Sequence, residues 1–190
     1  MALRRTTVAA TSGTLRKPPS LVFQTLLTLA RQRDGLNAGR CQAVLEFLET
    51  SGALGAGIRR ELAADGLSRV TFAVLLALFA IDPVAASPSD LALHTGVGRP
   101  AVSSALDGLC RRQLVVRGAG TADRRVRYVT LTVAGREAVD RAAMRCLHLL
   151  GQAAQLLPAA DLANLRATCA LLHEGTLRGH SADTSSLPAP

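Results

Sequence analysis

The part of the sequence best suited to binding chemistry is a basic segment over residues 99–127. It holds seven arginines against two aspartates, a net charge of +5 out of +8 for the 190-residue chain. Short hydroxyl side chains stand near its start, where Ser103 and Ser104 follow Arg99 and Pro100. Guanidinium and hydroxyl groups bind phosphates and base edges. The segment therefore has the composition of a nucleic-acid-binding surface, although a solvated helix face uses the same residue types.

A helix from residue 98 to 112 is expected to present these side chains. Gly98 can serve as its N-cap, and Pro100 lies in the first turn, where a missing N–H costs no helical hydrogen bond. The helix dipole disfavours a cation at this end by about 0.3–1 kcal/mol, so Arg99 is easier to explain if it meets a phosphate or a guanine edge. Helical spacing turns the opposite face inward, with Val102, Leu106 and Leu109.

The surrounding segment, residues 87–131, has the order helix, turn, helix and hairpin. Two β-prone runs, 114–117 and 126–131, follow the second helix. A glycine-rich loop between them ends in Asp123, Arg124 and Arg125. This order predicts a winged helix-turn-helix, a module that places its second helix in the major groove of DNA. The wing is expected over residues 117–127 and on the minor groove.

Short motifs in this segment resemble, in order and spacing, the MarR family of bacterial regulators. They are Leu91-Ala92, Gly96-Val97, Arg99-Pro100-Ala101-Val102, Leu106-Asp107-Gly108-Leu109, Leu114-Val115 and Asp123-Arg124-Arg125. The stretch 131–136, Leu-Thr-Val-Ala-Gly-Arg, is similar to the LT-x-x-GR pattern that begins a long helix in that family. The match runs from about residue 40 to residue 174. Gly98 departs from the family's usual Ser cap, which weakens one phosphate contact.

The resemblance implies a homodimeric DNA-binding repressor or activator, often relieved by a small aromatic or anionic ligand or by oxidation. For the wing, it implies that Asp123 braces the loop and that Arg125 reaches the minor groove. Arg124 or Arg127 would then bind phosphate. Narrow A·T-rich minor grooves attract arginine, so this contact reads shape rather than bases; the alternative is an ordinary exposed hairpin tip. The residues expected to contact DNA are Arg99, Pro100, Ser103, Ser104, Arg117, Arg124, Arg125 and Arg127.

Helical patterns on both sides of this segment carry more apolar surface than one small winged unit can cover. The further helices are expected at 20–31, 38–64, 70–81, 132–156 and 160–172. Gly52, Gly55 and Gly57 interrupt the second and by themselves suggest a loop, since each costs about 1 kcal/mol in a helix interior. A homodimer reading a pseudo-palindromic site would bury the apolar surface. The predicted fold class is mainly α (α+β), a winged helix-turn-helix with N- and C-terminal dimerisation helices.

The composition, 48% hydrophobic with 3% aromatics and no Trp, argues against a single-strand or RNA binder built on base stacking. The longest apolar run, 70–81, falls short of the ~18 residues of a membrane span, so a cytoplasmic protein without a membrane partner is expected. The first residues also have the composition of an organellar transit peptide. The expected parts are a disordered basic arm (1–19), dimerisation helices (20–66), a DNA-binding lobe (67–132), dimerisation helices (133–175) and a disordered tail (176–190).

The four cysteines show no C-x-x-C spacing, so neither a metal site nor a disulfide framework is expected. Each is most simply a small buried hydrophobic residue. A redox switch is the alternative, with Cys110 beside two arginines that favour a thiolate and Cys41 near the start of a dimerisation helix. The peroxide-sensing branch of the family pairs its sensor Cys with tyrosines from nearby helices. It fits poorly, because the one tyrosine, Tyr128, lies in the wing.

Catalysis has little support, because four scattered histidines form no Ser-His-Asp pattern and no phosphate loop is present. Neither an enzyme nor a cofactor is therefore expected. A ligand switch through a pocket between the dimerisation helices and the DNA-binding lobe is the favoured regulation. The conceivable anion partners, which are equally well explained as solvated side chains, are Arg40, Arg59, Arg60 and His94. The remaining alternative is a winged-helix module that binds protein rather than DNA.

Overall fold

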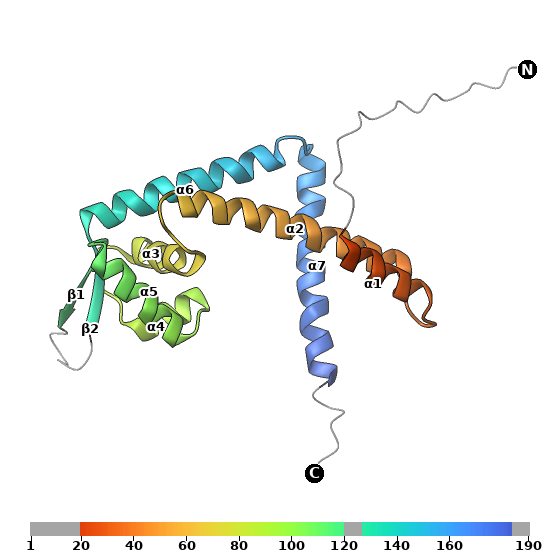
Figure 1. Cartoon of the computed structure of the whole chain (residues 1–190), viewed down its shortest axis with the longest axis horizontal. Coiled ribbons are helices and arrows are strands. Elements are labelled where there is room, and N and C mark those ends of the chain that lie inside the picture. The colour runs from red at the N-terminus through yellow and green to blue at the C-terminus, as the bar shows by residue number, and fades with distance from the viewer. Residues whose placement is uncertain (1–19, 120–126, 184–190) are drawn as a thin grey trace, which may run out of the picture. The chain divides into compact units, whose positions relative to one another are not determined.

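The computed structural model describes residues 20–119 and 127–183, which form helices and one small sheet (Figure 1). The elements are α1 (Leu21–Arg31), α2 (Ala38–Ala64), α3 (Arg69–Ile81), α4 (Pro88–Thr95), α5 (Arg99–Arg111), β1 (Val115–Ala119), β2 (Arg127–Leu131), α6 (Val133–Ala154) and α7 (Ala159–Asp183). The predicted mainly α class and the winged helix-turn-helix are confirmed. Two units, Met1–Ala53 and Leu54–Pro190, separate by their internal contacts, and α2 runs through both.

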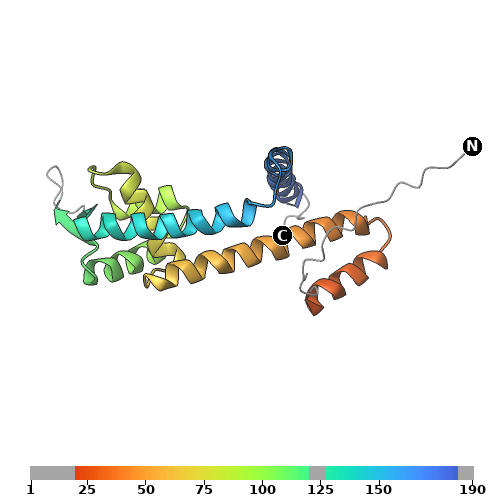
Figure 2. The same ribbon diagram turned by 90° about the horizontal axis from the view of Figure 1, so that it is seen from above.

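The first unit contains α1 folded back along the start of α2 (Figure 2). Ser20 caps α1 as expected, accepting a hydrogen bond from the Phe23 amide at 3.3 Å. The amide and the hydroxyl of Ser20 also donate to Glu49 Oε1 on α2, at 3.1 and 3.0 Å. On the inner face of α1 the buried residues are Phe23, Leu27 and Ala30.

The glycines of α2 do not break it, because the helix is continuous from Ala38 to Ala64. Gly57 is buried, and a Cβ at that position would lie 2.9 Å from Leu149 Cδ2 on α6. Its missing side chain therefore lets Leu149 sit against the backbone of α2. The pairing explains one glycine that suggested a loop in the sequence alone.

The second unit holds the helix-turn-helix around a hydrophobic core. Capping boxes begin α3 at Ser68 and α4 at Ser87, and Gly96 ends α4 in the left-handed region with φ of 65°. These are local signals of helix ends, and α3 agrees with the helix expected at 70–81. The largest fully buried side chains are Leu62, Leu75, Leu78, Leu91, Leu106, Leu109, Val74, Val102, Val115, Val129 and Val139.

The hairpin is an antiparallel pair in which Val115 faces Leu131 and Ala119 faces Arg127. β1 therefore runs two residues beyond the expected end at residue 117. A single bridge adds Ala86 to the sheet, since its N–H donates to the Val129 carbonyl at 3.1 Å and its carbonyl accepts from Val129 N at 2.9 Å. The bridge ties the start of the helix-turn-helix to the hairpin, and one residue is too short a signal for a sequence pattern to predict.

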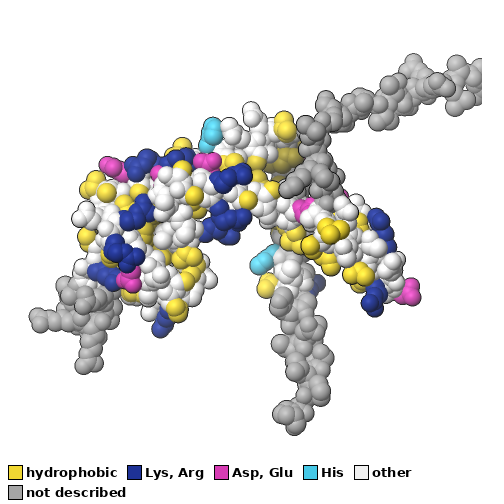
Figure 3. All heavy atoms as spheres, viewed as in Figure 1, with side chains coloured by type: hydrophobic (Ala, Val, Ile, Leu, Met, Phe, Trp, Pro, Cys, Tyr) yellow, Lys and Arg dark blue, Asp and Glu magenta, His cyan; other side chains and the backbone are white. Residues whose placement is uncertain are grey.

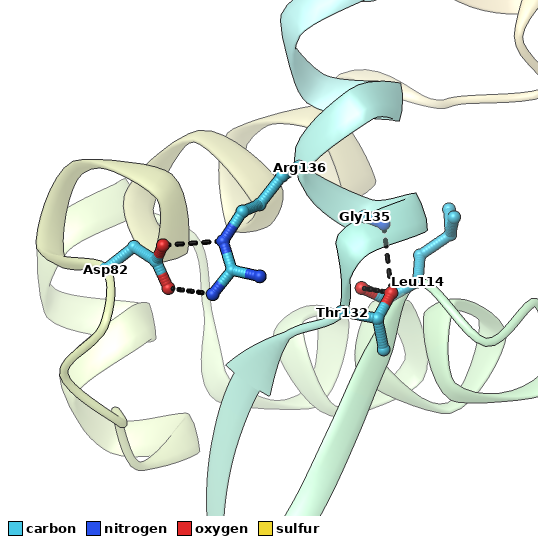
Figure 4. A network of polar contacts seen from close by, with 5 residues as sticks. All are labelled: Asp82, Leu114, Thr132, Gly135 and Arg136. Atoms are coloured by element: carbon cyan, nitrogen blue, oxygen red, sulfur yellow. Dashed lines mark hydrogen bonds and ion pairs between the residues drawn. The ribbon is translucent and has the colours of Figure 1, made fainter.

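The Leu-Thr-x-x-Gly-Arg pattern joins the start of α6 to the residue before β1 and to the end of α3 (Figure 4). Thr132 caps α6 by accepting from Gly135 N at 2.9 Å, and its hydroxyl lies 3.1 Å from the Leu114 carbonyl. A Cβ on Gly135 would lie 2.0 Å from that same carbonyl oxygen, so only glycine fits. Arg136 Nε and Nη2 donate to the two carboxylate oxygens of Asp82, at 2.6 and 2.8 Å. Thr132, Gly135 and Arg136 of the pattern thus each have a distinct packing or bonding role.

The last helix is longer than expected. α7 continues to Asp183, so the tail expected to be disordered from residue 176 is helical in its first part. Residues 176–183 contain no proline, and composition alone was a poor guide to where the helix ends. Among the described residues, no single helix combines the length and apolarity needed to cross a membrane, although the bent α2–α3 pair passes that test when taken together.

Candidate nucleic-acid interface

Helix α5 presents one buried and one exposed face, as the spacing predicted. Val102, Ala105, Leu106 and Leu109 are buried in the core. The opposite face is exposed and carries the side chains expected to contact DNA, which are Arg99, Pro100, Ser103 and Ser104. Gly98 is the N-cap and supplies no side-chain hydrogen bond to the first turn. The helix therefore offers a hydroxyl-bearing and cationic N-terminal face to solvent, held by a fully packed underside.

Arg112, at the C-terminal end of α5, belongs to the fold rather than to this face. Its Nη1 donates to the Gly66 carbonyl at 2.8 Å, and its Nη2 donates to the Asp65 carbonyl at 2.7 Å. The Asp65 carboxylate in turn pairs with Arg145 of α6. The α2–α3 turn is thus tied to both α5 and α6, and one arginine counted in the basic segment uses two of its N–H donors within the protein.

Arg117, expected as a DNA contact on the wing, points back to α5. Its Nη2 lies 2.7 Å from Asp107 Oδ1, and the two side chains are 33% and 53% exposed. Sequence reasoning counted Asp107 among the charges but gave it no role. The available signal was its place one turn after Ser103 on the outward face.

The rest of the wing is described in part. Arg127 begins β2, and its backbone pairs with Ala119. The wing-bracing residue and the remaining predicted contacts, which are Asp123, Arg124 and Arg125, lie outside the described residues. Their roles stay predictions.

The cysteines are free thiols in separate places. Cys41 is half-buried in the first unit, and Cys110 is half-buried on α5. Arg112, one of the two arginines expected to favour a thiolate at Cys110, is bound to backbone carbonyls instead. Burial raises the pKa of the Cys146 thiol, and the charge of Glu61 acts in the same direction. The described part of the chain has no group of three side chains suited to a metal ion.

Open grooves lie between helices in the described part of the second unit. One, of about 350 Å³ between α2 and α6, is lined by Glu61, Met144, Arg145, His148, Leu149 and Gln152. Another, of about 420 Å³ between α3 and α4, is lined by Ala73, Leu76, Ala77, Ala80, Ile81, His94 and Thr95. Of the four residues named as anion partners from the sequence, His94 alone lines either of these two grooves.

An exposed second helix packed on a helix-turn-helix core, with a hairpin beside it, defines a winged helix-turn-helix protein. Residues 65–126 match the model of the MarR family. The resemblance found in the sequence is therefore confirmed over the helix-turn-helix and the start of the hairpin.

Proteins of similar sequence or fold agree with this match at low identity. The HTH-type transcriptional repressor YetL of Bacillus subtilis (strain 168) is 28% identical over 106 residues, which cover 56% of this chain and 64% of YetL. The transcriptional repressor CouR, bound to a 23-mer DNA duplex, is 25% identical with a TM-score of 0.59, covering 68% of this chain and 90% of CouR. A MarR family transcriptional regulator from Silicibacter pomeroyi is 27% identical with a TM-score of 0.54, covering 70% of this chain and 88% of that one. These relatives are named as regulators rather than enzymes.

Proposed function

We propose that this protein is a cytoplasmic transcriptional regulator that binds double-stranded DNA, with α5 in the major groove and the hairpin on the minor groove. The observation that carries the proposal is the exposed face of α5, whose side chains are Arg99, Ser103 and Ser104 over a fully buried underside. Side chains at the N-terminal end of a recognition helix reach base edges in this type of module. The described CouR complex with a duplex shows that a relative of this fold binds DNA.

The test is a fluorescence-anisotropy titration of the full chain on duplex DNA from upstream of its own gene and on random duplex, over a series of salt concentrations. We expect affinity to fall steeply with salt, because each phosphate neutralised releases a counterion.

Arg99→Ala and Ser103→Ala should alter preference between the two duplexes. Arg141→Ala, on α6, removes the same charge from a helix outside the proposed interface and is the matched control for Arg99→Ala. Equal losses in Arg99→Ala and Arg141→Ala would contradict the assignment of α5. A DNA affinity that does not change with salt concentration would instead favour a protein-interaction module.

Arg125 has a different expected role. Substitution to Ala should weaken binding almost uniformly across sequences and lower the salt slope by about one, as for the loss of one phosphate-region contact. A slope and an affinity equal to those of the wild type would remove Arg125 from the contact surface.

We further propose that the regulator acts as a homodimer through its terminal helices. None of the described α7 side chains, residues 159–178, is buried, and a helix of this length gains little stability without packing. Leu162, Leu165 and Leu171 are among its exposed apolar residues, and Met144, Leu147 and Leu150 are exposed on α6. Hydrophobic side chains also gather on the visible face of α1 (Figure 3), where Leu21, Val22, Leu26 and Leu29 are exposed. A second copy is the partner that would bury them in a two-fold arrangement.

The mass in solution, measured by light scattering after gel filtration, should be about twice the 19.8 kDa of one chain. Leu165→Glu should lower that mass, whereas Leu93→Glu, an exposed leucine on α4, should not. A wild-type protein that stays at one chain mass at micromolar concentration would refute the dimer.

We propose that a small aromatic or anionic ligand binds in the α2–α6 groove. The protein is then a repressor that this ligand releases from DNA. Arg145 lines this groove and also holds Asp65, whose backbone carbonyl holds Arg112 at the end of α5. An anion that draws Arg145 away from Asp65 would loosen this chain of contacts, and it can act only by favouring the loosened state.

Benzoate should raise the melting temperature of the wild type more than benzamide, its uncharged counterpart, and Arg145→Gln should remove the difference. A difference that survives Arg145→Gln would place the ligand elsewhere. The redox alternative, a switch at Cys110 or Cys41, is tested by peroxide. DNA affinity that is unchanged after peroxide treatment would discard it.

A further inference from the structure

One acidic side chain stands on the outward face of α5. Asp107 is exposed and lies on the same side of the helix as Ser103 and Ser104. A carboxylate facing a duplex is repelled by phosphates. Its presence on the proposed DNA-reading helix therefore needs a physical reason.

The partner of Asp107 supplies that reason. Arg117, the third residue of β1, donates from Nη2 to Asp107 Oδ1 at 2.7 Å. The pair joins the helix proposed for the major groove to the hairpin proposed for the minor groove. Both side chains keep contact with water, 33% exposed for Arg117 and 53% for Asp107. An ion pair this exposed adds little to the stability of a fold, so its contribution is better sought in binding.

We propose that Asp107 is a positioning residue that holds Arg117 over the phosphate backbone between the two grooves, where Arg117 binds a phosphate. This inference rests on the proposed DNA-binding function. A protein with a helix in one groove and a hairpin in the next must cross the intervening phosphate backbone, and groups that link these elements lie over it. The guanidinium has five N–H donors in a fixed fork, and the bond to Asp107 takes one of them. The remaining donors can bind a phosphate oxygen without a further loss of side-chain freedom.

The pair also differs from the other arginine links between elements. Arg112 donates two N–H groups to backbone carbonyls, and Arg136 donates to both carboxylate oxygens of Asp82. Each of those arginines has two N–H donors committed to partners within the protein. Arg117 is bound to a single carboxylate oxygen, which leaves more of its donors for a second anion.

Two other roles for Asp107 give different outcomes. If Arg117 acted alone and Asp107 only repelled DNA, removing the carboxylate would strengthen binding. If Asp107 accepted a hydrogen bond from a cytosine amino group, its removal would change the preference at one base pair whether or not Arg117 was present. The positioning role predicts weaker binding, on all duplexes, that depends on Arg117.

The experiment is a double-mutant cycle in the full chain with Asp107→Asn, Arg117→Gln and the double variant, titrated on upstream and random duplex at several salt concentrations. Arg117→Gln should weaken binding to both duplexes by roughly tenfold, as for one lost hydrogen bond to a charged group, and lower the salt slope by about 0.9. Asp107→Asn should also weaken binding, although it makes the protein more positive. The double variant should bind like Arg117→Gln alone. Asp107→Glu should restore part of the loss.

Asp140→Asn, which removes an exposed carboxylate from α6, is the matched control and should not weaken binding. Circular dichroism at each salt concentration checks that every variant stays folded, so that a change of slope reports on contacts with DNA. Tighter binding by Asp107→Asn, or additive effects in the double variant, would overturn the positioning role while leaving DNA binding intact. A wild type that binds neither duplex would instead overturn the proposed function, and this inference with it.

Discussion

Gly135 is the position where a single added methyl group should do most damage. Its Cβ would lie 2.0 Å from the Leu114 carbonyl oxygen, 3.0 Å from the Leu114 carbonyl carbon and 3.2 Å from Leu131 Cδ2. Backbone must therefore move, since a Cβ contact under 3.0 Å is essentially never found in proteins. Such overpacking costs about 1–3 kcal/mol. Movement of α6 also weakens the Thr132 cap, which contributes about 1 kcal/mol. The gain in helix propensity from Gly to Ala, about 1 kcal/mol, offsets part of this.

We therefore expect Gly135→Ala to lower the free energy of unfolding by about 1–3 kcal/mol, measured by urea denaturation followed by circular dichroism. Gly151→Ala is the matched control, because Gly151 lies on the same helix with no atom within 4 Å of its added Cβ. It should be neutral or stabilise by up to about 1 kcal/mol. If Gly135→Ala proves as stable as Gly151→Ala, the close contact between α6 and the Leu114 carbonyl is wrong.

Three further predictions concern stability and the arginine contacts. Gln113 has φ of 58°, so Gln113→Gly should raise the free energy of unfolding by about 0.5–1 kcal/mol; a lower urea midpoint would contradict this. The hydrogen bonds from Arg136 hold the pKa of Asp82 below its usual range. The contribution of the Asp82 carboxylate to the free energy of unfolding is therefore present at neutral pH and is lost as pH falls through that lowered pKa. Asp82→Asn should thus be less stable than wild type at pH 7, with a difference that shrinks in acid; a constant difference down to pH 2 would refute the linkage. Arg112→Gln should cost about 1–2 kcal/mol through two lost bonds to carbonyls but leave the salt slope of DNA binding unchanged, and a lower slope would make Arg112 a phosphate contact.

Local signals made most of the fold predictable. The caps at Ser20 and Thr132 and the continuous helix over residues 38–64 match the structure, as does the buried face of α5. Each depends on side chains within a few residues of one another, so the sequence displays it directly. The exposed N-terminal face of α5 follows from the same periodicity. The end of α7 was missed because Gly175, a residue type that commonly ends helices, lies within α7 instead of ending it.

The sequence by itself determined the order of elements, the inward faces and the basic character of the reading helix, because helical periodicity, turn glycines and charge are properties of neighbouring residues. Tertiary structure alone decided which arginines bind other groups of the protein and which groups those are. Arg112 reaches carbonyls at residues 65 and 66, and Arg117 reaches Asp107 across the α5–β1 turn. Those partners meet only when the chain closes around its core, and no spacing along the sequence encodes a contact made across that closure.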